Sequence, residues 1–241
     1  MKTINVNEII KTVKELSIEA NYYLPNDVKE AIEEAEKNEK WPIANNILNK
    51  ILENSQIAAA EKMPICQDTG MACVFVDIGQ DVHITGGSLE EAINEGVRQG
   101  CAEGFLRKSV VKDPIHRVNT NDNTPALIYY NMVPGDKVKI TVAPKGFGSE
   151  NMSRIAMLKP SDGLEGVKNF VLETVRMAGP NPCPPIVIGV GIGGSFDKAA
   201  YLAKKALIRP VNENNTDEFY SNLEKELLEE VNKIGIGPQG F

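Results

Sequence analysis

The chain has 241 residues, of which 42% are hydrophobic, a usual content for a globular protein with a buried core. A formal net charge of −7 argues against a nucleic acid or an acidic membrane as partner, since either requires a basic surface. The sequence has no apolar stretch long enough to span a membrane and no signal-peptide pattern, and its four cysteines do not make a disulfide framework. We therefore expect a cytoplasmic protein with reduced thiols.

Hydrophobic periodicity predicts a helical N-terminal region followed by a region with both helices and strands. Apolar residues recur at helical spacing over residues 6–16, 26–38 and 41–62. Later segments predict strands over 72–78, 126–132, 136–143 and 186–192, the last of them buried, and helices over 88–104, 164–178, 196–207 and 216–234. A strong turn signal at 133–136 joins the second and third strands.

The predicted fold class is mixed α/β in a single domain. A helical N-terminal layer over about residues 1–62 precedes an α/β region with a small sheet over about residues 63–241.

Cys66 begins the most informative run, because a thiol, an amide, a carboxylate and a hydroxyl follow one another in Cys66-Gln67-Asp68-Thr69. Cys183 lies far downstream between prolines. A fold can assemble widely separated thiolates into a soft-metal site such as an iron–sulfur cluster, whereas a zinc finger requires thiols two to four residues apart. The alternative for Cys66 is a partly buried free cysteine. Asp68 and Thr69 are either acid/base groups or a turn that caps the next element.

Three loops are candidates for binding a small anion. Cations at 107–108 and 116–117 flank a polar loop at 119–125, which suits a dicarboxylate because arginine pairs with carboxylates bidentately; a solvated surface loop is the alternative. Glycine-rich segments at 145–151 and 189–195 either bring backbone N–H groups to an anion or form tight turns with close helix–strand packing.

Five motifs in a fixed order resemble one family, the class I iron–sulfur fumarate hydratases and L-tartrate dehydratases, in their α-subunit or N-terminal domain. The motifs span nearly the whole chain and lie at residues 64–70, 123–126, 145–151, 181–185 and 189–195. The resemblance implies a [4Fe–4S] cluster held by three cysteines, with one iron left open as a Lewis acid. It also implies reversible dehydration of (S)-malate to fumarate, with L-tartrate as the alternative substrate.

Matched motif by motif, the resemblance assigns Cys66 and Cys183 as cluster ligands. It assigns substrate binding to Gln67, Asp68, Arg107 and Gly148, with Asp68 also the candidate catalytic acid/base group. A β-subunit is expected to supply the remaining groups, in a dimer of heterodimers.

The end of the sequence departs from the family pattern. Residues 236–241 lie inside a glycine-rich family segment, and the third cluster cysteine is expected beyond Phe241. We therefore expect a truncated chain that is inactive by itself. A non-catalytic anion- or nucleotide-binding module and a redox-sensing thiol at Cys66 are the alternatives, and iron content separates both from the hydro-lyase.

Overall fold

The computed structural model describes residues 2–241 and confirms the mixed α/β class with a helical N-terminal region. The chain divides into two compact units. The first contains the residues up to Leu24 and Glu53–Phe147; the second contains Pro25–Leu52 and Gly148–Phe241. No described helix is long and apolar enough to cross a membrane.

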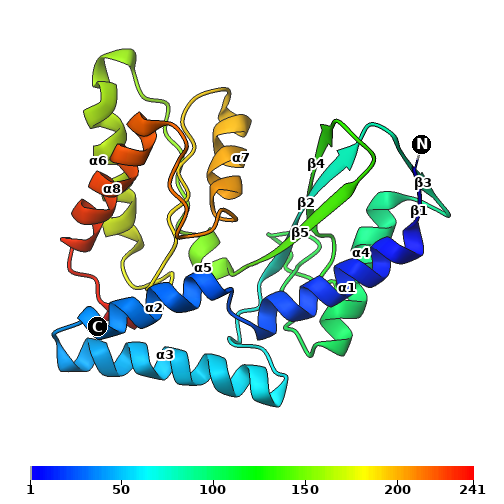
Figure 1. Cartoon of the computed structure of the whole chain (residues 1–241), viewed down its shortest axis with the longest axis horizontal. Coiled ribbons are helices and arrows are strands. Elements are labelled where there is room, and N and C mark those ends of the chain that lie inside the picture. The colour runs from blue at the N-terminus through cyan, green and yellow to red at the C-terminus, as the bar shows by residue number, and fades with distance from the viewer. Residues whose placement is uncertain (1) are drawn as a thin grey trace. The chain divides into compact units, whose positions relative to one another are not determined.

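A three-stranded sheet forms the centre of the first unit, in the order β4-β2-β5 (Figure 1). The central strand β2 (Met71–Gly79) pairs in parallel with β4 (Leu127–Val133) and antiparallel with β5 (Val138–Lys145). All three strands were predicted, but β4 and β5 flank β2 instead of pairing with each other. Two short parallel strands, β1 (Lys2–Asn5) and β3 (Val82–Thr85), were not predicted.

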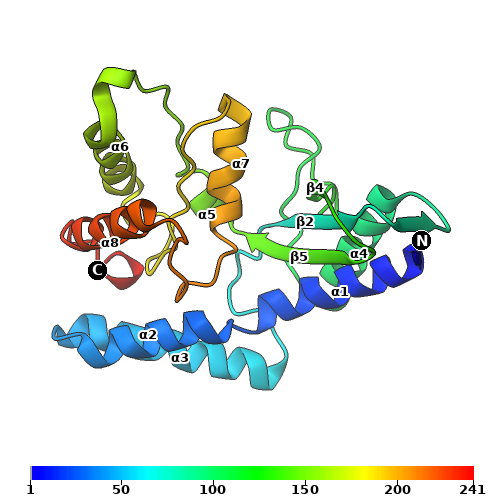
Figure 2. The same cartoon turned by 45° about the horizontal axis from the view of Figure 1, so that its top comes forward.

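Helices α1 (Val6–Tyr22) and α4 (Leu89–Glu103) pack on the sheet of the first unit (Figure 2). Val13 of α1, Ile93 of α4 and Val74 of β2 are completely buried in the resulting core. Removing each such side chain from water contributes about 1.5–3 kcal/mol, so this packing fixes the two helices on the sheet. Ser88 caps α4 as predicted, because its hydroxyl accepts the Glu91 N–H at 3.4 Å.

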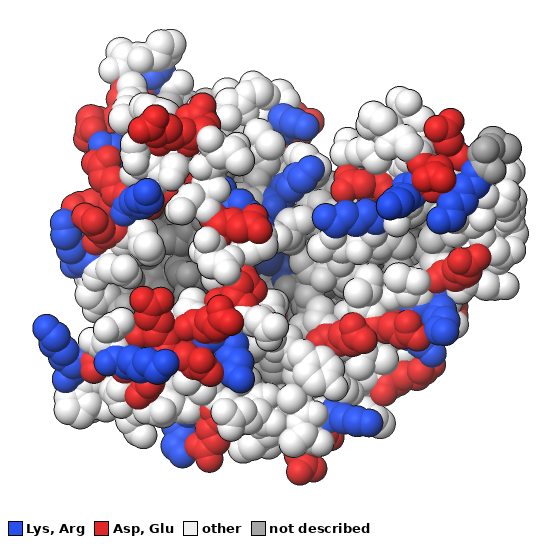
Figure 3. Space-filling model, viewed as in Figure 1, with Lys and Arg blue, Asp and Glu red and all other residues white. Residues whose placement is uncertain are grey.

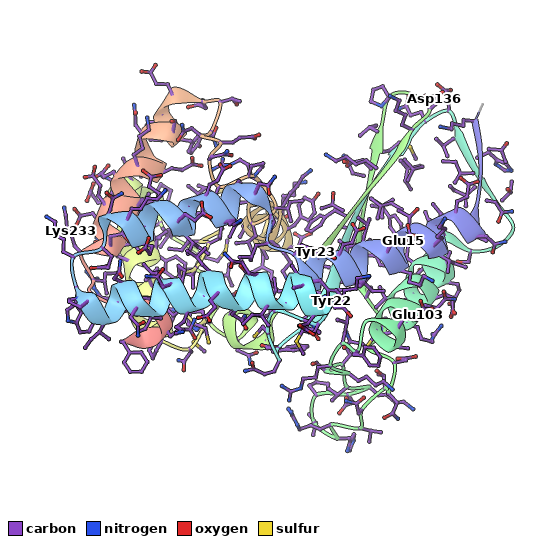
Figure 4. The ribbon with its side chains drawn as sticks, turned by 60° about the horizontal axis from the view of Figure 1, so that its bottom comes forward. Glu15, Tyr22, Tyr23, Glu103, Asp136 and Lys233 are labelled. Carbon is purple, nitrogen blue, oxygen red and sulfur yellow. The ribbon has the colours of Figure 1, made fainter. Side chains whose placement is uncertain are left out.

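The C-terminal ends of α1 and α4 are bonded to each other beside two loops that carry predicted site residues. Figure 4 labels Tyr22 on α1 and Glu103 on α4. The buried Tyr22 hydroxyl donates to the Gly104 carbonyl at 3.1 Å, and Lys14 forms an ion pair with Glu103 at 3.0 Å. One residue before Tyr22, the Asn21 carbonyl accepts the Ile65 N–H at 2.9 Å. The end of α1 therefore positions both the loop that follows α4 and the loop that leads to Cys66.

The second unit is mainly helical; its long helices agree with the predicted segments, whereas a short helix was not predicted. It contains α2 (Asn26–Asn38), α6 (Gly163–Ala178), α7 (Phe196–Ala206), α8 (Glu218–Asn232), the first part of α3 (Pro42–Glu61) and most of the short α5 (Phe147–Glu150). Two 3-10 turns, η1 (Pro160–Asp162) and η2 (Pro238–Gly240), complete it.

Charged side chains of both signs are interspersed on the face of the molecule drawn in Figure 3.

In the second unit, α6 and α8 pack side by side, and Lys168 of α6 pairs with Glu226 of α8 at 2.6 Å. Glu226 is exposed, and an exposed ion pair of this kind contributes about 0–1 kcal/mol. Helix packing therefore depends on the apolar contacts more than on this pair.

The prediction of a buried strand at 186–192 is wrong. The segment forms no strand, and Ile186, Val187, Ile188 and Ile192 are 37–49% exposed. No described residue forms a hydrogen bond with its backbone. An apolar run shows only that the side chains are hydrophobic. A strand additionally requires a neighbouring strand to pair with, which residues 2–241 do not supply here.

The glycines of the same segment pack closely against α7. A Cβ atom added at Gly189 would lie 2.1 Å from the Ala203 carbonyl oxygen, and one added at Gly191 would lie 2.1 Å from the Ala199 carbonyl oxygen. Of the two interpretations of this glycine-rich segment, close packing on a helix is therefore the one that the contacts support.

Candidate functional site

The loop between α3 and β2 carries Cys66, Gln67 and Asp68. It is held at its beginning, where the Asn54 side chain donates to the Ile65 carbonyl at 2.8 Å. It is also held at its end, where Thr69 and Gly70 are buried. Between these two anchors Cys66 and Gln67 are exposed and Asp68 is half-buried. The backbone is thus fixed on both sides of three accessible polar side chains.

Cys66 interacts with its two neighbours in this loop. Its Sγ atom accepts the Asp68 N–H at 3.4 Å, and its thiol donates to Gln67 Oε1 at 3.6 Å. Cys66 and Cys183 are exposed free thiols, whereas Cys73 and Cys101 are buried, as predicted for core residues. Burial raises the pKa of the Cys101 thiol, so this thiol is less reactive than an exposed one.

Gly70 brings the Cys66 loop against the end of β5. Its φ of 64° lies in the left-handed region, and an added Cβ would lie 2.0 Å from the Lys145 carbonyl oxygen. No other residue fits such a position without moving the backbone. At Gly146, the residue after Lys145, an added Cβ would lie 3.0 Å from Asp68 Oδ2. The backbone at the beginning of the 145–151 glycine segment therefore lies directly beside the Asp68 carboxylate.

Arg107 lies next to the same loop. The Thr69 hydroxyl oxygen accepts the Arg107 backbone N–H at 2.9 Å, and the Arg107 side chain is exposed. A carboxylate at 68 and a guanidinium at 107 are therefore attached to backbone segments that are bonded to each other. This places one acidic and one cationic side chain in one region of the first unit, and such side chains are able to transfer a proton and to bind a carboxylate, respectively.

The polar loop at 119–125 is more ordered than a solvated surface loop. Asn123 and Thr124 are buried, and Asp122 accepts hydrogen bonds from the Thr124 backbone N–H and hydroxyl and from Arg98 Nε at 3.0 Å. Burial alone would raise the pKa of Asp122, but these hydrogen bonds outweigh it and lower the pKa to about 2. Asp122 is therefore an ionised structural group that fastens the loop to α4.

The predicted site residues fall into two groups. Cys66, Gln67, Asp68 and Arg107 belong to the first unit, in the two connected loops described above. Gly148 and Cys183 belong to the second unit, where Cys183 has a φ of 56° and follows α6. Within residues 2–241, no three His, Cys, Asp or Glu side chains gather as a metal-binding group.

The donor chemistry at Cys66 and Cys183 fits an iron–sulfur cluster, since exposed, unpaired thiols are the soft ligands that such a cluster takes. They are the two cysteines that the family resemblance assigns as cluster ligands.

Sequence reasoning missed the roles of Thr69 and Asn123. Thr69 was interpreted as an acid/base group or a turn residue, and Asn123 as part of a polar loop that either binds an anion or is a solvated surface loop. Both side chains instead bond to backbone groups of neighbouring segments. The sequence signal is the asparagine directly before Thr-Pro; in the structure Asn123 has a positive φ, a conformation that asparagine tolerates.

Comparisons with known proteins identify the family. The family model for fumarate hydratase (Fumerase) matches residues 10–241. The chain is 48% identical over 240 residues to a Methanocaldococcus jannaschii protein named "Putative L(+)-tartrate dehydratase subunit alpha", covering 97% of this chain and 84% of that protein. It is 32% identical to the L(+)-tartrate dehydratase subunit alpha of Escherichia coli strain UTI89, covering 98% of this chain and 78% of that protein.

The fold, the paired loops and these matches define a subunit of the hydro-lyase class. The chain belongs to the fumarate hydratase (Fumerase) family, and its similar relatives carry the name of an α-subunit.

Proposed function

We propose that the chain is the α-subunit of an iron–sulfur hydro-lyase that reversibly dehydrates (S)-malate to fumarate. The observation that supports this most directly is the bond from the Arg107 N–H to the Thr69 hydroxyl, next to Asp68. It attaches a cation suited to a substrate carboxylate to the loop that carries a carboxylate suited to proton transfer. A dicarboxylate whose dehydration removes one carbon-bound proton requires both groups.

Each residue then has a defined task. Arg107 binds a substrate carboxylate, the Gln67 amide donates to a substrate oxygen, and the backbone at Gly148 lies against the ligand. Asp68 takes the proton from the carbon next to the hydroxyl-bearing carbon, and it returns that proton when fumarate is hydrated.

Cys66 and Cys183 would hold a [4Fe–4S] cluster as thiolates. When bound, the cluster would supply a Lewis-acidic iron that makes the substrate hydroxyl a better leaving group. The exposure of both thiols supports this assignment, because a ligating sulfur must be accessible to the metal.

L(+)-Tartrate is the second candidate substrate, and the names of the relatives favour it. Tartrate differs from malate by one additional hydroxyl group. Both are four-carbon 2-hydroxydicarboxylates, so Arg107 and Asp68 have the same tasks with either. The relatives' names also support a β-subunit partner, and we propose a dimer of heterodimers.

The test is dehydration by the chain co-expressed with its β-subunit and reconstituted anaerobically with iron and sulfide. Fumarate should form from malate only when iron is supplied, or oxaloacetate from tartrate if tartrate is the substrate. Asp68→Asn should lower kcat by about 100-fold or more. Asp136→Asn is the matched control, because Asp136 is exposed in the turn between β4 and β5 (Figure 4).

Equal activity with and without iron would contradict the cluster. Full activity in Asp68→Asn would contradict the role of Asp68. Dehydration of neither substrate by an iron-loaded complex would exclude the proposed reaction.

A further inference from the structure

Asn123 connects two loops that are far apart in the sequence. Its side chain is only 5% exposed, and its Oδ1 atom accepts the backbone N–H groups of Ser109 at 2.9 Å and Val110 at 3.2 Å. Its Nδ2 atom donates to the Gly70 carbonyl oxygen at 3.0 Å. Both lone-pair positions of the side-chain oxygen are thus used, and the amide nitrogen is bonded on the opposite loop.

The three bonds meet at the ends of the two segments that carry the candidate site. Gly70 ends the loop that contains Gln67 and Asp68, and Ser109 lies two residues after Arg107. The Thr69 hydroxyl supplies a second connection between the same loops through the Arg107 N–H. The loops therefore meet at a buried polar contact rather than through an apolar core, and the geometry of that contact depends on specific hydrogen bonds.

The backbone around Asn123 is held by bonds between its neighbours and α4. Its φ of 62° places it in the left-handed region, and the neighbouring Asp122 is bonded to Arg98 of α4. On its other side, the Ala126 N–H donates to Asn94 of α4 at 2.9 Å. The residues beside Asn123 are thus bonded to α4, which fixes the position of this asparagine relative to the core of the first unit.

We propose that Asn123 is a positioning residue that sets the spacing between the Asp68 carboxylate and the Arg107 guanidinium. This inference rests on the function proposed above. Asn123 acts through the backbone at Gly70, Ser109 and Val110 and does not touch the substrate. A displacement of about 1 Å between substrate-orienting and proton-transfer groups can reduce a rate by about 100-fold, so loss of this contact should impair turnover while the fold persists.

Asn123→Ala removes all three bonds, and Asn121→Ala is its matched control. Asn121 lies on the same loop with a φ of 69°, and its side chain is exposed. The same replacement at both positions therefore carries the same backbone cost at positive φ. Any difference between the two variants reports the side-chain bonds of Asn123. Asn123→Asp is a milder variant, because a carboxylate still accepts from Ser109 and Val110 but cannot donate to Gly70.

The first measurement is amide hydrogen exchange on the chain itself, which needs neither cluster nor partner. Asn123→Ala should accelerate exchange at Ser109 and Val110 by about 10-fold or more relative to Asn121→Ala, while amides of β2 remain protected. Asn123→Asp should leave these two amides protected. Unchanged exchange at Ser109 and Val110 in Asn123→Ala would overturn the proposal.

The second measurement is steady-state kinetics of the reconstituted complex. Asn123→Ala and Asn123→Asp should lower kcat about 10-fold and raise KM for the dicarboxylate, with the visible absorption of the cluster equal to that of Asn121→Ala. If the variants match Asn121→Ala in both kcat and KM, the positioning role is wrong although the enzyme is active. If the unaltered complex dehydrates neither malate nor tartrate, the proposed function fails first and this role fails with it.

Discussion

Asn94 offers a direct test of how much a buried hydrogen bond stabilises the first unit. Its side chain is 8% exposed on α4; Oδ1 accepts the Ala126 N–H at 2.9 Å, and Nδ2 donates to the Glu90 carbonyl at 3.1 Å. Asn94→Ala leaves the Ala126 N–H at the beginning of β4 buried without an acceptor. An unsatisfied buried donor costs about 1–3 kcal/mol.

The higher helix propensity of alanine offsets about 0.5 kcal/mol of this loss. We therefore expect Asn94→Ala to lower the free energy of unfolding by about 0.5–2.5 kcal/mol, which for a chain of this size lowers Tm by about 1–10 °C. Urea unfolding followed by circular dichroism measures the loss. Native-state hydrogen exchange of the β4 amides shows whether the first unit is the part that loses stability, since two compact units need not unfold together.

Asn131→Ala is the matched control for this experiment. The Asn131 side chain also donates one hydrogen bond, to Asp77 Oδ1 at 2.9 Å, but Asn131 is exposed and water can replace its partner. We expect a change below about 0.5 kcal/mol. If Asn131→Ala destabilises the protein as much as Asn94→Ala, burial of the bonded N–H is not the cause and the reasoning is refuted.

Three further outcomes follow from burial and charge. Ile93→Ala should cost about 2–5 kcal/mol in chemical unfolding because Ile93 is 0% exposed, whereas Phe105→Ala, at 84% exposed, should cost less than about 0.5 kcal/mol; equal losses would contradict the packing. The folded-state pKa of Asp122, about 2, lies below its ordinary 3.8, so its stabilisation is present above about pH 4 and lost as pH falls toward 2. Asp122→Asn should flatten the acid side of the Tm–pH curve, and an unchanged curve would exclude this role. Iodoacetamide at about pH 8 should label Cys66 and spare buried Cys101 until urea is added, as read by peptide mass spectrometry; early labelling of Cys101 would contradict its burial and raised pKa.

Local sequence signals were sufficient where an element depends on its own residues. The periodicity of the helices placed α2 at the residues observed, and Ser88 was identified as the cap of α4 because a hydroxyl before an amphipathic segment satisfies the first free N–H groups. The apolar run of β2 was likewise predicted. These features require no knowledge of distant residues.

The same signals failed where an element depends on a neighbour. Residues 186–192 have the composition of a buried strand, yet they remain exposed because no described residue pairs with their backbone. Conversely, β1 is a short strand whose pairing with β3 was not predicted, since strand pairing is a long-range contact.

The candidate site shows the same division. The sequence by itself predicted the family, because the motif that contains Cys66 and Asp68 and four later motifs resemble it, and the family match agrees with that resemblance. Only the tertiary structure decided how these residues are held. Thr69 and Asn123 bond to backbone groups of loops remote in the sequence, and such bonds depend on where the chain folds back rather than on local residue type.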